Sequence, residues 1–205
     1  MPTPTRRRNL RGHGALLRDE ILAAAARVID GAASEAEVSL RRIAREAGIA
    51  APSVYAHFAD LERVLEAVTE SSWVQVSDEI AENVQRAVDP RERLLIGCRV
   101  YVSFAQRHPL RYALMTQDGQ TPPAARRALE AVTRGLLACR GQVPDSESDP
   151  ASDRIAATLA VALHGVAMLH RSDAPNLWLS DFTTDEVIRT LVDGATLLLA
   201  DPERV

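Results

Sequence analysis

Residues 39–58 read SLRRIAREAGIAAPSVYAHF, beginning at Ser39 and ending at Phe58. Ser39 is a good helix N-cap, because its hydroxyl can accept a hydrogen bond from a free backbone N–H of the first turn. Gly48 can adopt the positive φ that ends a helix in a tight turn. Pro52 suits the first turn of a second helix, since its ring fixes φ near the helical value. The stretch therefore predicts two short helices joined by a tight turn, which is the helix-turn-helix plan.

The second helix of this motif begins with small side chains, which would let its backbone come close to DNA. The major groove admits one helix of this size, and the free N–H groups at a helix N-terminus favour phosphate. Tyr55 and His57 can donate hydrogen bonds to phosphate oxygens. For Arg41 and Arg42, an exposed and solvated helix face is the alternative interpretation. The motif residues that we expect to contact DNA are Ser39, Arg41, Arg42, Ala50, Ala51, Pro52, Ser53, Tyr55 and His57.

Charge is distributed unevenly along the 205 residues, whose net charge is −4 and whose 24 basic residues are all arginine. Residues 1–45 hold nine arginines and five acidic residues (+4), whereas residues 46–205 hold fifteen and twenty-three (−8). A basic front on an acidic body indicates that the front meets a polyanion. We expect residues 1–13 to form a flexible basic arm, with a solvated tail of no function as the alternative. The arm residues expected to reach DNA are Arg6, Arg7, Arg8 and Arg11.

Hydrophobic periodicity predicts an all-α chain of about nine helices, with no alternating strand pattern. The predicted helices cover about residues 15–32, 39–47, 52–58, 61–88, 90–108, 110–115 and 122–140, followed by two apolar helices around residues 155–166 and 187–198. Asp60 is a predicted N-cap, and Thr183 with Glu186 forms a predicted capping box. The acidic, serine-rich residues 144–153 are expected to form a mobile loop.

Several classes of function lack their sequence signatures here. The chain has no G-x-S-x-G motif, P-loop, HExxH motif or His/Cys cluster with metal-ligand spacing, so we expect no catalysis, metal or cofactor. Cys98 and Cys139 have no CxxC spacing and are interpreted as small buried residues. No apolar run approaches the roughly 18 residues of a membrane span, and no signal peptide is present. These observations favour a cytoplasmic protein.

The N-terminal part of the chain resembles the TetR family of regulators over about residues 14–76. The matching elements are Ile21-Leu-x-Ala-Ala25, Ser39, Ile43-Ala44, Gly48-Ile49 and Val54-Tyr55-x-His-Phe58. Many members of the family carry a lysine at the start of the next helix, where this chain has Leu61 followed by Glu62. The phosphate contact of that lysine is therefore not expected here, and the arginines of the arm are expected to compensate.

The remaining part, residues 77–205, resembles the WHG-type ligand-binding class of the same family. The resemblance rests on His108-Pro109-Leu-Arg-Tyr112-Ala-Leu-Met115 and on Leu163-His164-Gly165, where Leu163 replaces the tryptophan of the class name. It implies an effector pocket, expected to include Tyr101, Phe104, His108, Tyr112, Met115, His164, Met168 and Trp178, although residues of these types at helical spacing are also typical of a plain core. It also implies a dimer through the last two long helices, with Ile155, Leu159, Leu163, Val187, Leu191 and Leu198 at the interface.

The resemblance and the residues together predict three segments: a basic arm (1–13), a three-helix DNA-binding domain (14–76, with the motif at 39–58) and a helical domain for ligand binding and dimerisation (77–205). The expected function is that of a homodimeric repressor, which binds a palindromic operator in double-stranded DNA and responds to a small-molecule effector. A transcriptional activator is one alternative. A helical ligand- or protein-binding module with a vestigial DNA-binding head is another, which Leu61 favours and the basic charge of residues 1–45 disfavours.

Overall fold

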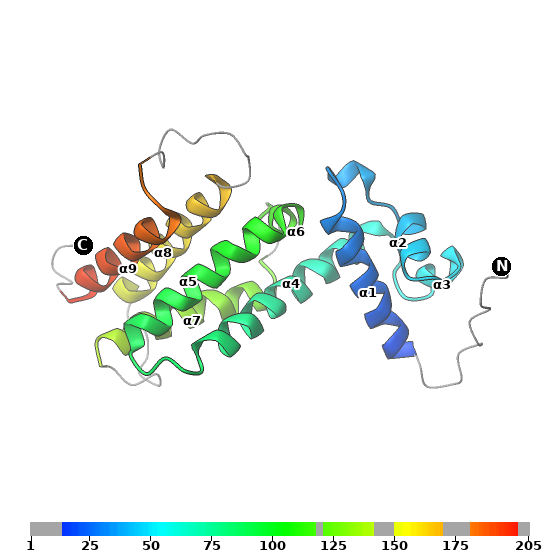
Figure 1. Cartoon of the computed structure of the whole chain (residues 1–205). Coiled ribbons are helices and arrows are strands. Elements are labelled where there is room, and N and C mark those ends of the chain that lie inside the picture. The colour runs from blue at the N-terminus through cyan, green and yellow to red at the C-terminus, as the bar shows by residue number, and fades with distance from the viewer. Residues whose placement is uncertain (1–13, 118–120, 142–149, 170–180, 201–205) are drawn as a thin grey trace. The chain divides into compact units, whose positions relative to one another are not determined.

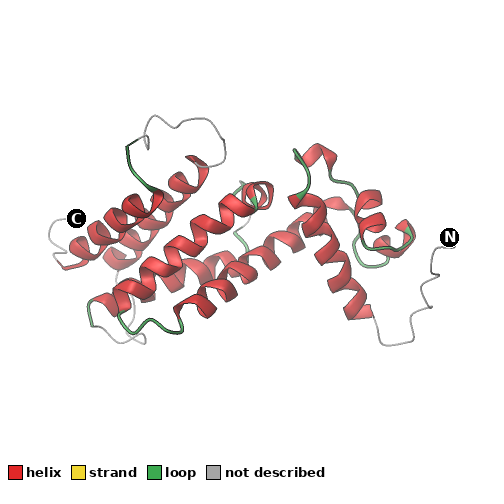
Figure 2. Cartoon of the chain, in the orientation of Figure 1, coloured by secondary structure: helices red, strands yellow, loops and turns green. Residues whose placement is uncertain are grey.

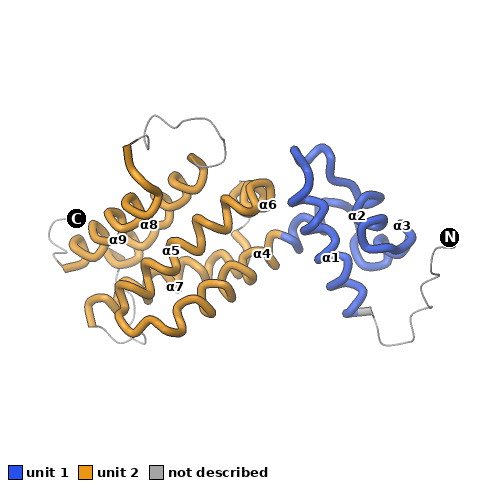
Figure 3. Tube along the Cα trace, in the orientation of Figure 1, with its two compact units in different colours: residues 1–68 blue, residues 69–205 orange. Residues whose placement is uncertain are grey.

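The computed structural model describes residues 14–117, 121–141, 150–169 and 181–200, which form nine α-helices and one 3₁₀ turn without strands (Figures 1 and 2). The chain divides into two compact units, residues 1–68 (unit 1) and 69–205 (unit 2) (Figure 3). The division falls within α4 (Leu61–Val84), earlier than the predicted boundary after residue 76. Because α4 is one continuous helix, the sequence has no break that marks the division.

Unit 1 contains α1 (Gly14–Asp30), the 3₁₀ turn η1 (Glu35–Glu37), α2 (Leu40–Glu46), α3 (Ala51–Tyr55) and the first residues of α4. Helix α2 packs against both α1 and α3. The interior of the unit is apolar, as the hydrophobic periodicity predicts. Its buried side chains are Ile21, Ala24, Ala25, Val28, Ile29, Val38, Leu40, Ile43, Ala44, Val54, Phe58, Val64 and Val68.

The predicted helix ends of unit 1 are confirmed by their hydrogen bonds. The Ser39 hydroxyl accepts from the backbone N–H of Arg42 at 3.3 Å, and the Asp60 carboxylate accepts from the N–H of Arg63 at 2.9 Å. Gly48 has a φ of 66°, a left-handed conformation that favours glycine. The next residue donates its N–H back to the Ala44 carbonyl at 3.0 Å, which closes the turn between α2 and α3.

Unit 2 contains the rest of α4 together with α5 (Pro90–Arg107), α6 (Pro109–Met115), α7 (Pro123–Cys139), α8 (Pro150–Leu169) and α9 (Thr184–Ala200). Helices α5, α7, α8 and α9 enclose a common apolar core, and α8 and α9 run side by side (Figure 1). Helix α8 begins at Pro150, so the predicted loop over 144–153 is wrong in its last four positions. The predicted loop residues before Pro150 lie outside the described residues.

Helix α9 is fixed by its N-cap and by ion pairs with α5. The predicted capping box is confirmed: Thr183 Oγ1 accepts from the N–H of Glu186 at 3.2 Å, and the Glu186 carboxylate accepts from the N–H of Thr183 at 2.7 Å. Arg99 Nε lies 2.5 Å from Asp185 Oδ1. Hydrogen bonds from Arg99 and Arg189 lower the pKa of Asp185 to about 2. Because these side chains remain 36–52% exposed, each pair contributes little to the free energy of unfolding.

Helix α8 has the length and the mean hydropathy, 1.2, that a membrane-crossing helix shows. The sequence interpretation that no segment approaches such a span is therefore too strict. Core packing accounts for part of this composition, because 39% of the apolar window is buried and several of its large apolar side chains lie in the common core of unit 2. The core residues contributed by α8 are Ile155, Ala156, Leu159, Leu163 and Val166.

A chain of polar side chains crosses the interior of unit 2. The hydroxyl of Tyr112 (α6) lies 2.9 Å from the hydroxyl of Tyr101 (α5) and 2.7 Å from Nδ1 of His164 (α8). The ring of Trp73 (α4) stacks on that of Tyr101 with a centroid separation of 6.2 Å. Burial raises the pKa of Tyr101, which keeps its hydroxyl protonated and available as a donor. Tyr112 is fully buried, and its hydroxyl has these two side-chain groups within hydrogen-bond distance.

Replacing Tyr112 by Phe tests this chain of hydrogen bonds. We expect Tyr112→Phe to lower the free energy of unfolding by about 1–3 kcal/mol, because it leaves the Tyr101 hydroxyl and the His164 ring without their shared partner. The measurement is urea unfolding followed by circular dichroism. Tyr55→Phe, at an exposed tyrosine, is the matched control, with an expected change within about 0.5 kcal/mol. Equal effects of the two variants would contradict a structural role for the hydrogen bonds that join Tyr101, Tyr112 and His164.

Candidate nucleic-acid interface and ligand cavity

Helix α3 has one buried face and one exposed face. Val54 and Phe58, the latter just after the helix, are buried in unit 1, whereas 58% of Tyr55 is exposed. Ala50 and Pro52 are also exposed, and the predicted contacts Ala51, Ser53 and His57 are half-buried. The short side chains at the start of α3 leave its backbone accessible. The structure thus brings the predicted residues 50–57 together on one accessible segment.

The DNA contacts predicted at α2 differ in whether their side chains already have partners within the protein. Arg41 is exposed and has no side-chain partner within the described part of the chain. Arg42 is engaged: its guanidinium lies 3.4 Å from the Glu37 carboxylate and 3.5 Å from the carbonyl oxygen of Gly31. Ser39 serves as the N-cap of α2. Arg42 and Ser39 therefore have structural partners in the free protein, whatever contacts they make to DNA.

The predicted arm residues Arg6, Arg7, Arg8 and Arg11 lie outside the described residues.

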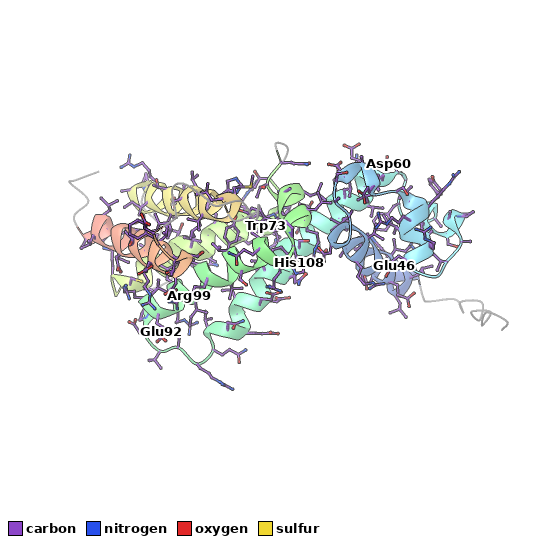
Figure 4. All side chains as sticks on the ribbon, turned by 45° about the horizontal axis from the view of Figure 1, so that its top comes forward. Glu46, Asp60, Trp73, Glu92, Arg99 and His108 are labelled. Atoms are coloured by element: carbon purple, nitrogen blue, oxygen red, sulfur yellow. The ribbon has the colours of Figure 1, made fainter. Side chains whose placement is uncertain are left out.

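Unit 2 contains a cavity of about 660 Å³, lined by residues of α4, α5, α7 and α8 and of the segment between α4 and α5. Most of the lining is apolar. Trp73 contributes to it from α4 (Figure 4), and its neighbour in the stack, Tyr101, contributes from α5. The volume lies within the range of about 300–1,000 Å³ that is typical of small-molecule sites.

Small residues on α7 leave this space empty. Ala125, Ala128, Ala131, Gly135 and Ala138 all line the cavity, and their spacing of three or four residues places them along one stripe of the helix. At Gly135 a Cβ atom would lie 3.2 Å from the Leu94 side chain, so α7 approaches α5 closely there. Gly135 and Leu94 both line the cavity, so this close contact between the two helices forms part of its wall.

The predicted pocket residues lie mostly beside the cavity. Among the described residues its lining includes Tyr101, whereas Phe104 and Met115 are outside the lining and pack with Val76, which does line the cavity. Tyr112 and His164 belong to the polar chain described above. Among the rest, His108 packs its ring against Phe104 at 4.8 Å, Met168 is exposed, and Trp178 lies outside the described residues.

The lining residues that sequence reasoning missed are small residues, aliphatic residues, two arginines and Trp73. Aromatic side chains of the HPLRYALM stretch fill space, so they form core, whereas the cavity exists where side chains are short. The signal available in the sequence was the alanine and glycine repeat along residues 125–138.

The predicted dimer residues are distributed between the core and the surface. Ile155, Leu159 and Leu163 are buried in the core of unit 2, and Val187 and Leu191 are partly buried against it. Leu198 is 39% exposed. The apolar side chains that α8 and α9 leave most exposed are Val161 and Leu197, each at 71%. The assignment of the six predicted residues to an interface stays a prediction, and three of them present little surface to a second copy.

The cysteines are free thiols, and Cys98 is buried. Burial raises the pKa of the Cys98 thiol to about 12, so it stays protonated and behaves as a small apolar group. Within the described ranges, no three His, Cys, Asp or Glu side chains are grouped closely enough to hold a metal ion.

Comparison with known proteins places two families along the chain. Residues 21–68 match the family described as "Bacterial regulatory proteins, tetR family". Residues 94–195 match the family described as "Tetracyclin repressor-like, C-terminal domain". The first match covers α2, α3 and most of α1, and the second covers most of α5 through most of α9. The helix-turn-helix thus falls within the first matched segment, whereas the cavity is lined partly by residues of the second and partly by residues of 73–93, which lie between the two matches.

Among curated relatives, the nucleoid occlusion factor SlmA of Vibrio vulnificus is 25% identical over 92 residues, which are 45% of this chain and 47% of the relative. The chain thus matches about half the length of this relative. Several solved structures share the fold. A protein of unknown function from Rhodococcus sp. RHA1 has a TM-score of 0.70 at 24% identity, with 96% of this chain and 98% of that chain covered.

A TetR-family regulator from Streptomyces coelicolor has a TM-score of 0.61 at 18% identity, covering 87% of this chain and 99% of the other. RolR in complex with resorcinol has a TM-score of 0.63 at 18% identity, and the alignment covers 92% of this chain and 95% of the RolR chain. These structures share the overall fold of this chain. With the two family matches, they establish that the chain belongs to the TetR family of transcriptional regulators.

Proposed function

We propose that this chain is a sequence-specific DNA-binding repressor, which binds a palindromic operator as a homodimer in the cytoplasm and is released by a small-molecule effector. The observation that carries the proposal is the two-faced helix α3, with Val54 and Phe58 buried and Tyr55 58% exposed after the Gly48 turn. A helix held by one face and accessible on the other is what a helix-turn-helix reader presents to the major groove.

The DNA contacts follow from the exposure of side chains in unit 1. Tyr55, Ser53 and His57 carry donors for phosphate oxygens, and such contacts fix the position of the protein on the duplex. Arg41 adds an exposed guanidinium one helix away. Base edges are then read by α3, whose short side chains at Ala50 and Ala51 allow close approach. The arginines of the arm supply further backbone contacts in this proposal.

The effector site in this proposal is the cavity of unit 2. Its size and apolar lining are those of a small-molecule site, and the related fold of RolR was solved with resorcinol bound. Helix α4 places Val64 and Val68 in the interior of unit 1 and lines the cavity with Trp73 and Val76. An effector that binds better to one arrangement of α4 than to another shifts the population between DNA-binding and released states.

The homodimer is proposed to form through the exposed stripe of α8 and α9. Val161, Gly165 and Met168 share one face of α8 by their spacing, and Gly194 and Leu197 share one face of α9. A Cβ atom added to Gly165 or Gly194 would meet nothing within 4 Å, so a second helix can approach both positions closely. Apolar side chains exposed together in this way are typical of an interface.

Titration of the full chain against its own upstream intergenic DNA tests the proposal. Fluorescence anisotropy is recorded at two salt concentrations with nonspecific competitor DNA. We expect tight, competitor-resistant binding that weakens as salt rises, because phosphate contacts release counterions. The proposal would be contradicted if the upstream DNA bound no more tightly than random DNA and if selection from random sequences also gave no sequence with tighter binding. A reporter fused to the promoter, with and without the protein, distinguishes a repressor from an activator.

Arg41→Gln tests the phosphate contact from α2. Binding should weaken to a similar degree on all sequences, and the slope of log affinity against log salt should fall in magnitude by about one, since one phosphate contact is lost. Arg126→Gln is the control, because Arg126 is an exposed arginine of unit 2. An unchanged slope in Arg41→Gln, or an equal change in the control, would place the phosphate contacts elsewhere.

Introducing charge into the exposed stripe tests the dimer. Val161→Asp combined with Leu197→Asp should convert the protein from a dimer into a monomer of 22.3 kDa in sedimentation equilibrium, because unpaired carboxylates would be buried between copies. The fold should persist, since both side chains are 71% exposed in the single chain. Val74→Asp, at an exposed valine of α4, is the control and should remain dimeric. A dimeric double variant would show that another surface forms the interface.

A further inference from the structure

The charge of the cavity lining restricts what it can bind. Two guanidinium groups line the cavity, Arg93 from α5 and Arg134 from α7, and the described lining includes no carboxylate. The rest is largely aliphatic or aromatic carbon, with the neutral thiol of Cys98 among it. A cationic ligand would leave water for a site without a counter-charge, which is unfavourable.

The two arginines differ in their existing partners. Arg93 Nη1 lies 3.3 Å from the carbonyl oxygen of Ala87 and 3.4 Å from that of Val84, which holds its guanidinium near the C-terminal end of α4. Arg134 has no ion-pair or hydrogen-bond partner among the described residues. A planar guanidinium without a carboxylate partner favours an anionic oxygen, which it can bind through two parallel hydrogen bonds.

We propose that the effector of this cavity is an apolar monoanion, a molecule with an extended hydrocarbon or aromatic body and one carboxylate-like group bound by Arg134 or Arg93 of the lining. This proposal rests on the proposed function, because it assumes that the cavity is the effector site. The body lies along the small residues of α7 and against the stacked rings of Trp73 and Tyr101. Burial of the apolar body contributes most of the binding affinity, and the attraction between the ligand anion and the arginines determines the specificity for anions over cations.

Three probes with the same ten-carbon body separate charge from apolarity: decanoate, decanol and decyltrimethylammonium, each below its micelle concentration. The chain has two tryptophans, so Trp178→Phe leaves Trp73, which lines the cavity, as the single reporter. Titration of Trp73 fluorescence gives the three dissociation constants. We expect decanoate to bind at least about tenfold more tightly than decyltrimethylammonium, with decanol between them.

Variants in the same background assign the preference to the arginines. Arg134→Gln should weaken decanoate binding about threefold to fivefold, the effect of one partly solvated charge pair, and leave decanol binding unchanged. Arg93→Gln should act in the same direction. Arg126→Gln is the matched control, since it removes an exposed charge of α7 outside the lining. Ala128→Phe, which fills the cavity, should weaken binding of all three probes.

The outcomes distinguish this proposal from the proposed function. Equal or tighter binding of decyltrimethylammonium overturns the monoanion proposal while the cavity remains the effector site. Unchanged decanoate binding in both Arg134→Gln and Arg93→Gln overturns it as well. A lack of response to all three probes, or binding unaffected by Ala128→Phe, overturns the monoanion proposal together with the assignment of the cavity as effector site, whereas the DNA-binding part of the proposed function is decided by the DNA titration alone.

Discussion

Side-chain volume at the helix contacts is the constraint on which both units depend. In unit 1, the buried Ala44 and the left-handed Gly48 allow α2 and α3 to approach closely, and that approach leaves Tyr55 on the outside. In unit 2, the small residues of α7 pack closely on α5 at Gly135 and leave a cavity of about 660 Å³ around it. Interiors of proteins are otherwise densely packed, so a space of this size requires short side chains from several helices at once.

Polar interactions inside unit 2 connect the cavity with the rest of its core. Tyr101 lines the cavity and shares its hydroxyl with Tyr112, which in turn contacts His164. A ligand that moves the Tyr101 ring therefore acts on α6 and α8 through hydrogen bonds that cannot be lost without cost in a buried site. Helix α4 is the covalent connection to unit 1, because the same helix carries Trp73 and the buried Val64.

Local chemistry made much of the fold predictable from sequence. The caps at Ser39, Asp60 and Thr183 and the turn at Gly48 depend on neighbouring residues alone, and all are confirmed. The cavity depends on which helices pack against one another, and the hydrophobic periodicity of the sequence predicts single helices without predicting their packing partners. Leu159 and Val161 show the same limit on one helix: both are apolar residues of α8, yet the chain covers the first and leaves the second exposed. Residue type also leaves open whether the aromatic residues near residue 108 form pocket or core, and in the structure Tyr101 lines the cavity whereas Phe104 and Tyr112 are buried outside its lining.

Protection of upstream DNA from DNase I by this chain is the decisive measurement for operator recognition by α3. We expect one protected region with a two-fold symmetric sequence, whose half-sites lie about one helical turn apart or a multiple of it, because a dimer presents two copies of α3. The protection should be lost in Tyr55→Ala, which removes an exposed donor without disturbing the core. Uniform protection without a preferred sequence, or a footprint unaffected by the change at Tyr55, would contradict the account.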